Sequence, residues 1–246
     1  MFVLAQLSDT HFDGSPRNTA RVADAMTFLA AMATPPDAIL VTGDVADHGS
    51  PAEYESARAT IVSDVPILWC PGNHDDRQAF AESLLNLDTT APLNYAYQLG
   101  ELTVAMCDST IPGEPGGELT ATTLDWLRGV LAGAPGPVVV AFHHPPVPVF
   151  NPITDTMGLA RPHELAAVLD AAPNVVAVLT GHAHMSAVTT FAGRPLIVAP
   201  SISSVLGNEF EADAPIVHYS TPPAIAFHML DETGRFTTLF RPITRS

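Results

Sequence analysis

Seven side chains that carry metal-ligand atoms occur in short, ordered clusters along this sequence: Asp9, His11, Asp44, Asn73, His143, His182 and His184. Carboxylate and amide oxygens mixed with imidazole nitrogens, without a thiolate, suit divalent Mn, Fe, Co, Ni or Zn rather than a structural zinc site. Seven ligands are too many for one catalytic ion, but they suit two ions that share a carboxylate. Two such ions can orient water and stabilise the attacking and leaving oxygens of a displacement at phosphorus. The pattern therefore predicts a two-metal centre that hydrolyses phosphate esters.

Each cluster also has a simpler interpretation when it is taken alone. Asp9-Thr10-His11 can be a helix cap followed by a surface histidine, and Gly43-Asp44 and Gly72-Asn73 can be turns. His143-His144 can be ordinary loop packing. The metal interpretation is favoured because the clusters occur in a fixed order at equivalent places in the predicted structure.

Those places are the ends of predicted β-strands, expected at 2–8, 38–42, 65–70, 138–142 and 175–180. Several of these stretches are continuous apolar runs, which are typical of strands covered on both faces. The sequence predicts helices with an apolar face or a capping residue at 17–33, 51–63, 77–85, 120–132 and 162–171. In open α/β sheets, ligands bind at the carboxyl ends of the strands. We therefore expect five strand ends to converge on one site.

The remaining segments predict a second sheet rather than a second domain. Residues 95–99 and 102–106 read as a hairpin, and the Gly/Pro-rich stretch 112–117 reads as a loop. The β-rich part at about 186–246 lacks helical period and predicts an antiparallel set at 186–192, 195–200, 215–219, 224–230 and 236–240. Parallel strands fed by helices need a covered second face, which favours two sheets packed face to face with helices outside. Because no repeat or linker divides the chain, we expect one domain over residues 1–246.

Composition limits the classes of partner. The net charge is −16 and every basic residue is Arg, so we expect no stable complex with nucleic acid and a small-molecule phosphate ester as substrate. Apolar stretches fall short of the roughly 20 residues that a membrane span needs. The N-terminus reads as a strand rather than a signal peptide, which favours the cytoplasm. Cys70 and Cys107 each end an apolar run and are expected to be buried, reduced thiols.

The clusters, taken in order, resemble those of the calcineurin-like metallophosphoesterases. The resemblance covers about residues 2–200 and rests on Asp9-x-His11, Gly43-Asp44, Gly72-Asn73-His74-Asp75, His143-His144-Pro145 and Gly181-His182-x-His184. More closely, the segments 7–11, 71–77 and 142–146 are similar to bacterial class III cyclic-nucleotide phosphodiesterases and their glycerophosphodiesterase relatives. The resemblance implies an α/β fold of the four-layer αββα sandwich type, with two mixed sheets flanked by helices.

The resemblance also implies a role for each residue. One ion would be bound by Asp9, His11 and His184, the other by Asn73, His143 and His182, and Asp44 would bridge them. His74 would face the substrate phosphate as a catalytic residue. We expect the Asp47 carboxylate to hold His74 through a hydrogen bond, although an exposed loop acid is the alternative. The role of His144 has two interpretations: it orients either a loop or the substrate.

The predicted reaction is attack on phosphorus by a hydroxide that bridges the two ions, with 3′,5′-cyclic AMP as the first candidate substrate. Alternatives are a broad phosphodiesterase or phosphomonoesterase acting on glycerophosphodiesters or 2′,3′-cyclic nucleotides, and a catalytically silent metal-binding scaffold. A metal-dependent nuclease is disfavoured because the sequence shows no basic groove.

The resemblance weakens after residue 200. The segment Asn208, Glu209 and Phe210 is expected in a loop at the rim of the site, and His218 and His228 are expected to be ordinary, partly buried residues in or beside strands. Antiparallel strands near the end of the chain could pair across a two-fold axis, which predicts a possible homodimer.

Overall fold

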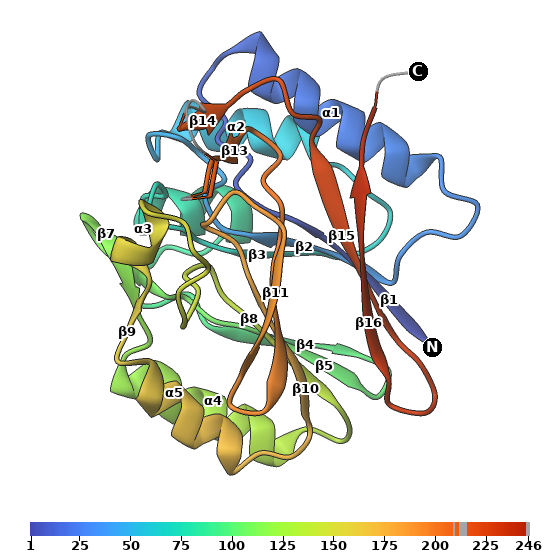
Figure 1. The fold of residues 1–246 in the computed structure, drawn as a ribbon, viewed down its shortest axis with the longest axis vertical. Coiled ribbons are helices and arrows are strands. Elements are labelled where there is room, and N and C mark those ends of the chain that lie inside the picture. The colour runs from blue at the N-terminus through green and yellow to red at the C-terminus, as the bar shows by residue number, and fades with distance from the viewer. Residues whose placement is uncertain (209, 212–215, 245–246) are drawn as a thin grey trace.

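Two mixed β-sheets pack face to face between two pairs of helices in the computed structural model, which describes residues 1–208, 210–211 and 216–244 (Figure 1). The helices α1 and α2 cover one outer face, and α4 and α5 cover the other. The predicted αββα arrangement is confirmed.

The first sheet has five strands, in the order β16 (Phe236–Pro242), β15 (Ala224–Leu230), β1 (Phe2–Leu7), β2 (Ala38–Thr42) and β3 (Ile67–Cys70). The strands β1, β2 and β3 are parallel, whereas β15 and β16 pair antiparallel. The parallel strands are connected through α1 (Pro16–Ala30) and α2 (Pro51–Thr60). Their carboxyl ends therefore lie at one edge of the sheet.

The second sheet has six strands, in the order β11 (Ala187–Phe191), β12 (Arg194–Val198), β10 (Val175–Thr180), β8 (Val138–Ala141), β5 (Leu102–Met106) and β4 (Tyr95–Leu99). Its connections include α4 (Ala121–Gly133) and α5 (Pro162–Asp170). The prediction that the strand at 195–200 pairs antiparallel with its neighbours is correct for one neighbour and wrong for the other. The strand β12 is antiparallel to β11 but parallel to β10, because the β11–β12 hairpin folds back beside β10.

Short elements surround the carboxyl ends of the strands: α3 (Arg77–Phe80), the π-helical turn η1 (Ala81–Leu85), β6 (Thr110–Ile111), β7 (Glu114–Glu118), the 3₁₀ turn η2 (Thr154–Met157), β9 (Leu159–Ala160), β13 (Val205–Leu206) and β14 (Val217–His218). The prediction of a loop at 112–117 holds for the turn at 112–113 but is wrong for 114–117, which lie in β7 and pair with β6 and β9. The strand β14 is shorter than the predicted 215–219, and residue 215 lies outside the described residues.

Local sequence signals explain where the helices begin and end. Ser15 caps α1, and Ser50 forms a capping box with Glu53 at the start of α2; each is followed by a proline in the first turn. The helix α1 ends at Ala30 rather than at the expected residue 33. Its C-cap is Ala31, and Thr34, which precedes Pro35, is disfavoured in a helix and so prevents any extension beyond residue 33.

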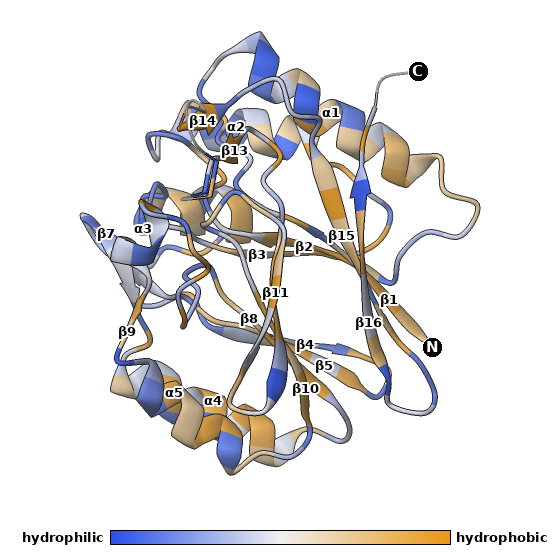
Figure 2. Ribbon diagram, in the orientation of Figure 1, coloured by the Kyte–Doolittle hydropathy of each residue, from blue (hydrophilic) through white to orange (hydrophobic). Residues whose placement is uncertain are grey.

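Apolar side chains fill three layers: one between each helix pair and its sheet, and one between the two sheets. Figure 2 shows the central strands as largely hydrophobic, whereas the helices carry both hydrophobic and hydrophilic residues. Cys70 and Cys107 are buried free thiols, as expected. Within the described residues, no helix has the length and apolarity needed to cross a membrane.

A buried polar chain crosses the space between the sheets beneath the carboxyl ends of the strands. The Gln6 amide donates from Nε2 to the Thr42 hydroxyl (2.8 Å) and to the Thr180 carbonyl (3.0 Å), and its Oε1 lies 2.9 Å from His228 Nε2. His228 Nδ1 lies 2.9 Å from the Thr238 hydroxyl. The expectation that His228 is only partly buried is wrong, because it is 1% exposed. Gln6 thus ties the end of β2 in one sheet to the end of β10 in the other.

Burial lowers the pKa of His228 to about 3, which makes a testable contribution to stability at acid pH. The folded protein keeps this ring neutral while the unfolded chain takes up a proton below about pH 6.5. The free energy of unfolding should therefore fall as pH falls from about 6.5 towards 3, and be unaffected by this group above that window. In His228→Gln, urea denaturation at several pH values should show this acid slope reduced by about 1.4 kcal/mol per pH unit, the value for one proton.

The exposed His163 supplies the control, and His163→Gln should keep the wild-type slope. An unchanged acid slope in His228→Gln would mean that the buried ring is already charged.

Candidate metal centre

All seven predicted ligands lie just beyond the carboxyl ends of five parallel strands. Three of these strands, β1, β2 and β3, belong to the first sheet, and β8 and β10 belong to the second. The site therefore forms where the two packed sheets present their ends to the same side. The expected convergence of five strand ends is what the structure shows.

Four of the candidate ligands form one compact group that could hold a metal ion: Asp9, His11, Asp44 and His184. Their ligand atoms all lie within 4.8 Å of one another. His11 Nε2 lies 3.0 Å from His184 Nε2, and His184 Nε2 lies 3.4 Å from Asp9 Oδ1. Two imidazole nitrogens and two carboxylates at these distances can surround a single divalent ion.

A second group adjoins the first through Asp44. His182 Nδ1 lies 3.2 Å from His143 Nε2, which lies 3.3 Å from Asp44 Oδ2. The same Asp44 oxygen is 3.6 Å from His11 Nε2 in the first group. A carboxylate placed between two nitrogen-rich groups is in position to be shared by two ions.

Asn73 offers the remaining oxygen. Its Oδ1 is buried and has no hydrogen-bond partner among the described residues, although buried amide oxygens are nearly always bonded. The next residue's backbone N–H donates to Asp44 Oδ1 over 3.0 Å, which holds Asn73 beside the shared carboxylate. An unpartnered oxygen at this place fits the coordination of a cation.

Hydrogen bonds made by Nδ1 of His11 and His143 leave the Nε2 atom of each ring facing the centre. His11 donates from Nδ1 to Asp47 Oδ1 over 2.8 Å, and His143 donates from Nδ1 to the Thr42 carbonyl over 2.8 Å. Because one ring nitrogen carries the proton, the Nε2 atom of each neutral ring keeps its lone pair towards the centre. The donor set and its tautomers therefore fit two divalent ions.

The backbone of the site is held in an uncommon conformation. Five of the seven residues have positive φ angles: Asp9 (53°), His11 (43°), Asp44 (49°), His182 (69°) and His184 (52°). Such angles are unusual for residues other than glycine and cluster at functional sites. Cross-loop bonds support them, including the His182 N–H, which lies 3.1 Å from both carboxylate oxygens of Asp9. The centre is built from strained turns that the rest of the fold holds in place.

Two glycines are required by close approach. A Cβ atom on Gly43, which has φ of +85°, would lie 2.3 Å from His143 Nδ1. A Cβ atom on Gly181 would lie 2.0 Å from the Ser8 hydroxyl oxygen and 3.0 Å from Asp9 Oδ2. Any side chain at these positions would displace residues of the centre.

Burial and mutual charge set the ionisation of the ligands. Burial raises the pKa of Asp9 to about 6 and lowers that of His182 to about 3. Burial also opposes ionisation of Asp44, but the neighbouring His143 holds the pKa of Asp44 well below its usual range. In turn Asp44 raises the pKa of His143 to about 9 against the effect of burial. A cation bound here would stabilise the carboxylate charge that burial disfavours.

The Asp47 carboxylate accepts no hydrogen bond from His74, so the expected hydrogen bond is wrong, although the two groups lie within ion-pair distance. It bonds to His11 instead and lies 3.8 Å from His74 Nδ1, which donates to the Asp47 backbone carbonyl over 2.9 Å. The reason is a backbone pairing that sequence spacing does not reveal: the Asp47 N–H donates to the Phe12 carbonyl and so places Asp47 beside His11.

His74 lies on the wall of a cavity of about 660 Å³ that the metal-ligand candidates also line. Its side chain is 42% exposed, in contrast to the buried ligands around it. Its ring meets that of His11 edge to face at 4.7 Å. His74 is therefore open to a substrate placed on the centre.

Two supporting residues were not identified from the sequence. The Asp75 carboxylate accepts hydrogen bonds from the N–H groups of Gly72 (2.8 Å), Val45 (3.1 Å) and Ala46 (2.9 Å), and so joins the loops after β2 and β3. The Ser204 hydroxyl lies 3.0 Å from His184 Nδ1. The sequence signal for Asp75 was the acid that ends Gly72-Asn73-His74-Asp75. The signal for Ser204 was the serine-rich stretch that follows the predicted strand 195–200.

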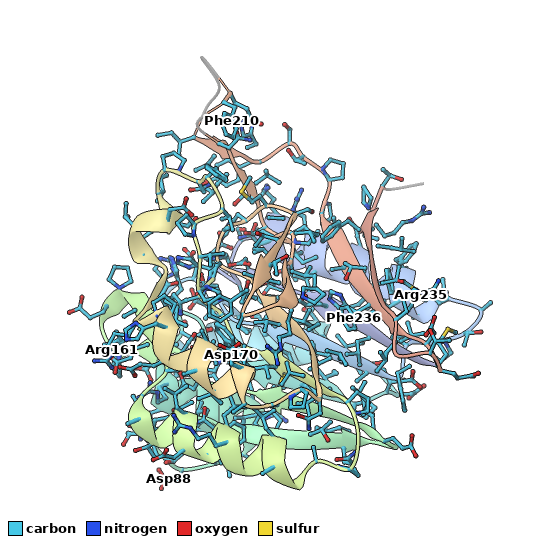
Figure 3. The ribbon with its side chains drawn as sticks, turned by 60° about the horizontal axis from the view of Figure 1, so that its bottom comes forward. Asp88, Arg161, Asp170, Phe210, Arg235 and Phe236 are labelled. Carbon is cyan, nitrogen blue, oxygen red and sulfur yellow. The ribbon has the colours of Figure 1, made fainter. Side chains whose placement is uncertain are left out.

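The segment expected at the rim is only partly described. Phe210 is 74% exposed, and its ring lies 5.9 Å from that of Phe150. Figure 3 shows Phe210 at the top of the molecule, away from Asp170 and Arg161. Glu209 lies outside the described residues. His218 is partly buried, as expected.

His144 lies beside His143 and His182, and its ligand atom lies within 4.8 Å of theirs, so it belongs to the same potential metal-binding group. Its ring centroid lies 4.9 Å from that of His143 and 4.8 Å from that of His182, and its Nδ1 lies 2.8 Å from the Ser109 hydroxyl. A Cβ atom on Gly117 of β7 would lie 2.3 Å from this ring. His144 thus fills the space between β7 and two candidate ligands.

Truncating His144 should loosen the ligands that it supports. In His144→Asn, we expect the affinity for the second Mn²⁺ ion to fall by about 10- to 100-fold, the usual cost of losing a residue that orients metal ligands. Calorimetric titration of metal-stripped protein measures this directly. His163→Asn, at an exposed histidine, should bind both ions as the wild type does. Two ions bound at wild-type affinity by His144→Asn would show that the ring is not needed.

Comparison with known proteins agrees with this geometry. Residues 2–186 match the family model described as calcineurin-like phosphoesterase. A protein of Rhodococcus erythropolis named a probable cyclic nucleotide phosphodiesterase is 38% identical over 212 residues, covering 80% of this chain and 70% of that protein. A glycerophosphodiester phosphodiesterase of Enterobacter lignolyticus is 30% identical over 244 residues, covering 94% and 88%.

A solved structure shows the same fold. A dimetal phosphatase of Danio rerio superposes with a TM-score of 0.76 at 16% identity, over 99% of this chain and 96% of that one. The match to the family model spans most of the chain, and residues that can bind metal gather where the motifs predicted. The chain belongs to the calcineurin-like phosphoesterase family and is a metal-dependent hydrolase of phosphate esters.

Proposed function

We propose that this protein is a phosphodiesterase of small substrates and that 3′,5′-cyclic AMP is its substrate. The observation that carries the proposal is the position of Asp44, whose carboxylate lies between two groups of ligands on the wall of a 660 Å³ cavity. The name of the R. erythropolis relative supports a cyclic nucleotide as substrate.

We propose that the candidate ligands divide between two ions in the way that the family resemblance implies. In this proposal Asp9, His11 and His184 would hold one ion, Asn73, His143 and His182 would hold the other, and Asp44 would be shared by both. Two bound divalent ions, with Mn, Fe, Co, Ni and Zn as candidates, would supply Lewis acidity and a water acidic enough to act as a nucleophile near neutral pH. The residues around them hold the geometry.

His74 acts on the substrate rather than on the ions. Its Nδ1–H is committed to the Asp47 carbonyl, which fixes the ring while its exposed position leaves Nε2 accessible from the cavity. In the protonated ring, Nε2–H donates to a phosphate oxygen and can pass its proton to the departing alkoxide. Asp47 contributes by orienting both His11, through its carboxylate, and His74, through its carbonyl.

The charge of the cavity favours small substrates over nucleic acids. Among the described residues that line it, Arg17 is the only lysine or arginine. A protein that binds a polynucleotide backbone needs several such cations. The homodimer and the cytoplasmic location stay predictions.

A glycerophosphodiester is the second candidate substrate, because a relative of that name matches 94% of this chain. Metal-stripped protein reloaded with each of the five metals should be tested on 3′,5′-cyclic AMP, 2′,3′-cyclic AMP, glycerophosphoethanolamine and p-nitrophenyl phosphate. We expect 3′,5′-cyclic AMP to have the highest kcat/KM. A higher value for glycerophosphoethanolamine would favour the second candidate, and turnover of the monoester alone would contradict both.

A further inference from the structure

We propose that an apolar wall of the cavity, formed by Leu206, Val217 and Tyr219, binds the planar base of a nucleotide and so selects nucleotides over phosphodiesters without a base. We call these three residues the ribbon wall. The proposal rests on the proposed phosphodiesterase function and extends it to the part of the substrate that does not react.

The geometry of the β13–β14 ribbon puts two of the three side chains on one face. Leu206 and Val217 are partners across the antiparallel pair, and side chains of directly opposite residues point to the same side. Tyr219 follows directly after β14 and lines the same cavity as these two residues. The cavity lining agrees, since it contains these three residues but not the alternate residues Val205 and His218.

Tyr219 offers an aromatic surface that is fixed in place. The Arg17 guanidinium carbon lies 4.8 Å from the centre of the Tyr219 ring, a cation–π arrangement. The same guanidinium donates from Nη2 to the Tyr219 carbonyl (2.8 Å) and to the Ser203 carbonyl (2.7 Å). Tyr219 is nevertheless 61% exposed. A ring that is held by a cation and still accessible is a suitable platform for stacking a base.

The wall is also tied to the metal centre. The Ser203 N–H donates to the carbonyl of Asp9 over 3.2 Å, so the contact between Arg17 and Ser203 connects the ribbon to the first group of ligands. A base stacked on Tyr219 and a phosphate on the ions would thus be held by parts of the protein that are bonded to each other.

A second segment adds apolar surface to the same cavity. Ile153 and Met157 line it, and both are partly buried. The fully buried Asn151 accepts hydrogen bonds from the Ile153 N–H (3.0 Å) and the Thr154 N–H (3.1 Å), and its amide donates to the Gly207 carbonyl over 3.4 Å. The turn that carries Ile153 and Met157 is therefore bonded to the ribbon.

The chemistry of this wall favours a base over glycerol. The cavity volume lies within the range of about 300–1,000 Å³ that is typical of small-molecule sites. A base has two apolar faces and stacks on aromatic rings, whereas glycerol and ethanolamine are polar and flexible. The side chains of Leu206 and Val217 offer them no hydrogen bonds.

Binding of 5′-AMP and ribose 5-phosphate to Mn²⁺-loaded protein tests the proposal, because these two ligands differ by the base alone. Calorimetry should show tighter binding of 5′-AMP to the wild type. In Tyr219→Ala we expect a loss of about 5- to 150-fold for 5′-AMP, the range for removing a stacked aromatic residue, and a change within about twofold for ribose 5-phosphate. Tyr219→Phe should retain wild-type binding.

Two further variants separate the wall from general damage. Val217→Ser, on the same face, should weaken 5′-AMP binding in the same direction. Ile216→Ala, at an exposed residue next to Val217 that does not line the cavity, should change the binding of neither ligand. In kinetics, Tyr219→Ala should raise KM for 3′,5′-cyclic AMP with little change in kcat, and leave kcat/KM for glycerophosphoethanolamine unaltered.

Equal binding of the two ligands by the wild type would overturn the proposal, as would an equal loss for both, or no loss, in Tyr219→Ala. Failure of the proposed function gives a different result: no phosphodiester is hydrolysed by any metal form, while the comparison of 5′-AMP with ribose 5-phosphate still decides whether the wall recognises a base.

Discussion

Replacing Asp44 with Asn is expected to leave the chain folded but to lower kcat/KM by about 10³-fold or more, because one carboxylate is then missing from both ions at once. Asp44 Oδ2 lies 3.6 Å from His11 Nε2 and 3.3 Å from His143 Nε2. The amide of Asn can still accept the backbone bond from the His74 N–H, so the loop keeps its support. The neutral Asn side chain, however, cannot offset the repulsion between two neighbouring cations.

Metal analysis and turnover should be measured on the same sample. We expect fewer than two ions per chain in Asp44→Asn under conditions that saturate the wild type. Asp13→Asn is the matched control, because Asp13 lines the same cavity but is exposed. It should keep two ions and a rate within about threefold of the wild type. Two ions and wild-type turnover in Asp44→Asn would contradict the bridging role.

Removing His74 should separate catalysis from metal binding. His74→Ala is expected to lose about 10²- to 10⁴-fold in kcat, the contribution of a positioned acid or base, while metal content stays at the wild-type level. The reason is geometric: the ring is bonded to the Asp47 carbonyl, lies open to the cavity, and leaves both groups of ligands complete when it is removed.

His48→Ala is the control for this second substitution. His48 is 70% exposed and contacts the same neighbour, with its Nε2 3.5 Å from the Asp47 carboxylate, but it does not line the cavity. It should therefore retain most of the activity. If His74→Ala lost an ion instead of rate alone, His74 would have to be reassigned as a ligand, in the potential group that it forms with His11 and Asp47.

The strands and the convergence of the site could be predicted because local signals determine them. The runs ending at Leu7, Thr42 and Ala141 are apolar enough to mark buried parallel strands. Parallel strands of one sheet bring their carboxyl ends to one edge, and the face-to-face packing of the two sheets brings the two edges together. The polar residues that follow these strands could therefore be expected to lie close together.

What escaped prediction depends on pairings between distant segments. The strand β7 forms because Gly117 meets Leu159, and Asp47 reaches His11 because its backbone N–H finds the Phe12 carbonyl. The ribbon that carries Tyr219 is likewise positioned by Arg17, about 200 residues earlier in the chain. Arg17 donates a hydrogen bond to the Tyr219 carbonyl, and no local sequence pattern predicts it. Spacing along the chain does not encode such contacts.

Three of the five strand ends belong to one sheet and two to the other. Bound ions would therefore cross-link the two sheets. Metal loading should therefore raise the melting temperature of the whole molecule, as expected for a ligand that binds the folded state alone. It also means that metal binding and activity should depend on how the two sheets are packed against each other. A substitution in the apolar layer between the sheets is therefore expected to change metal affinity without touching a candidate ligand.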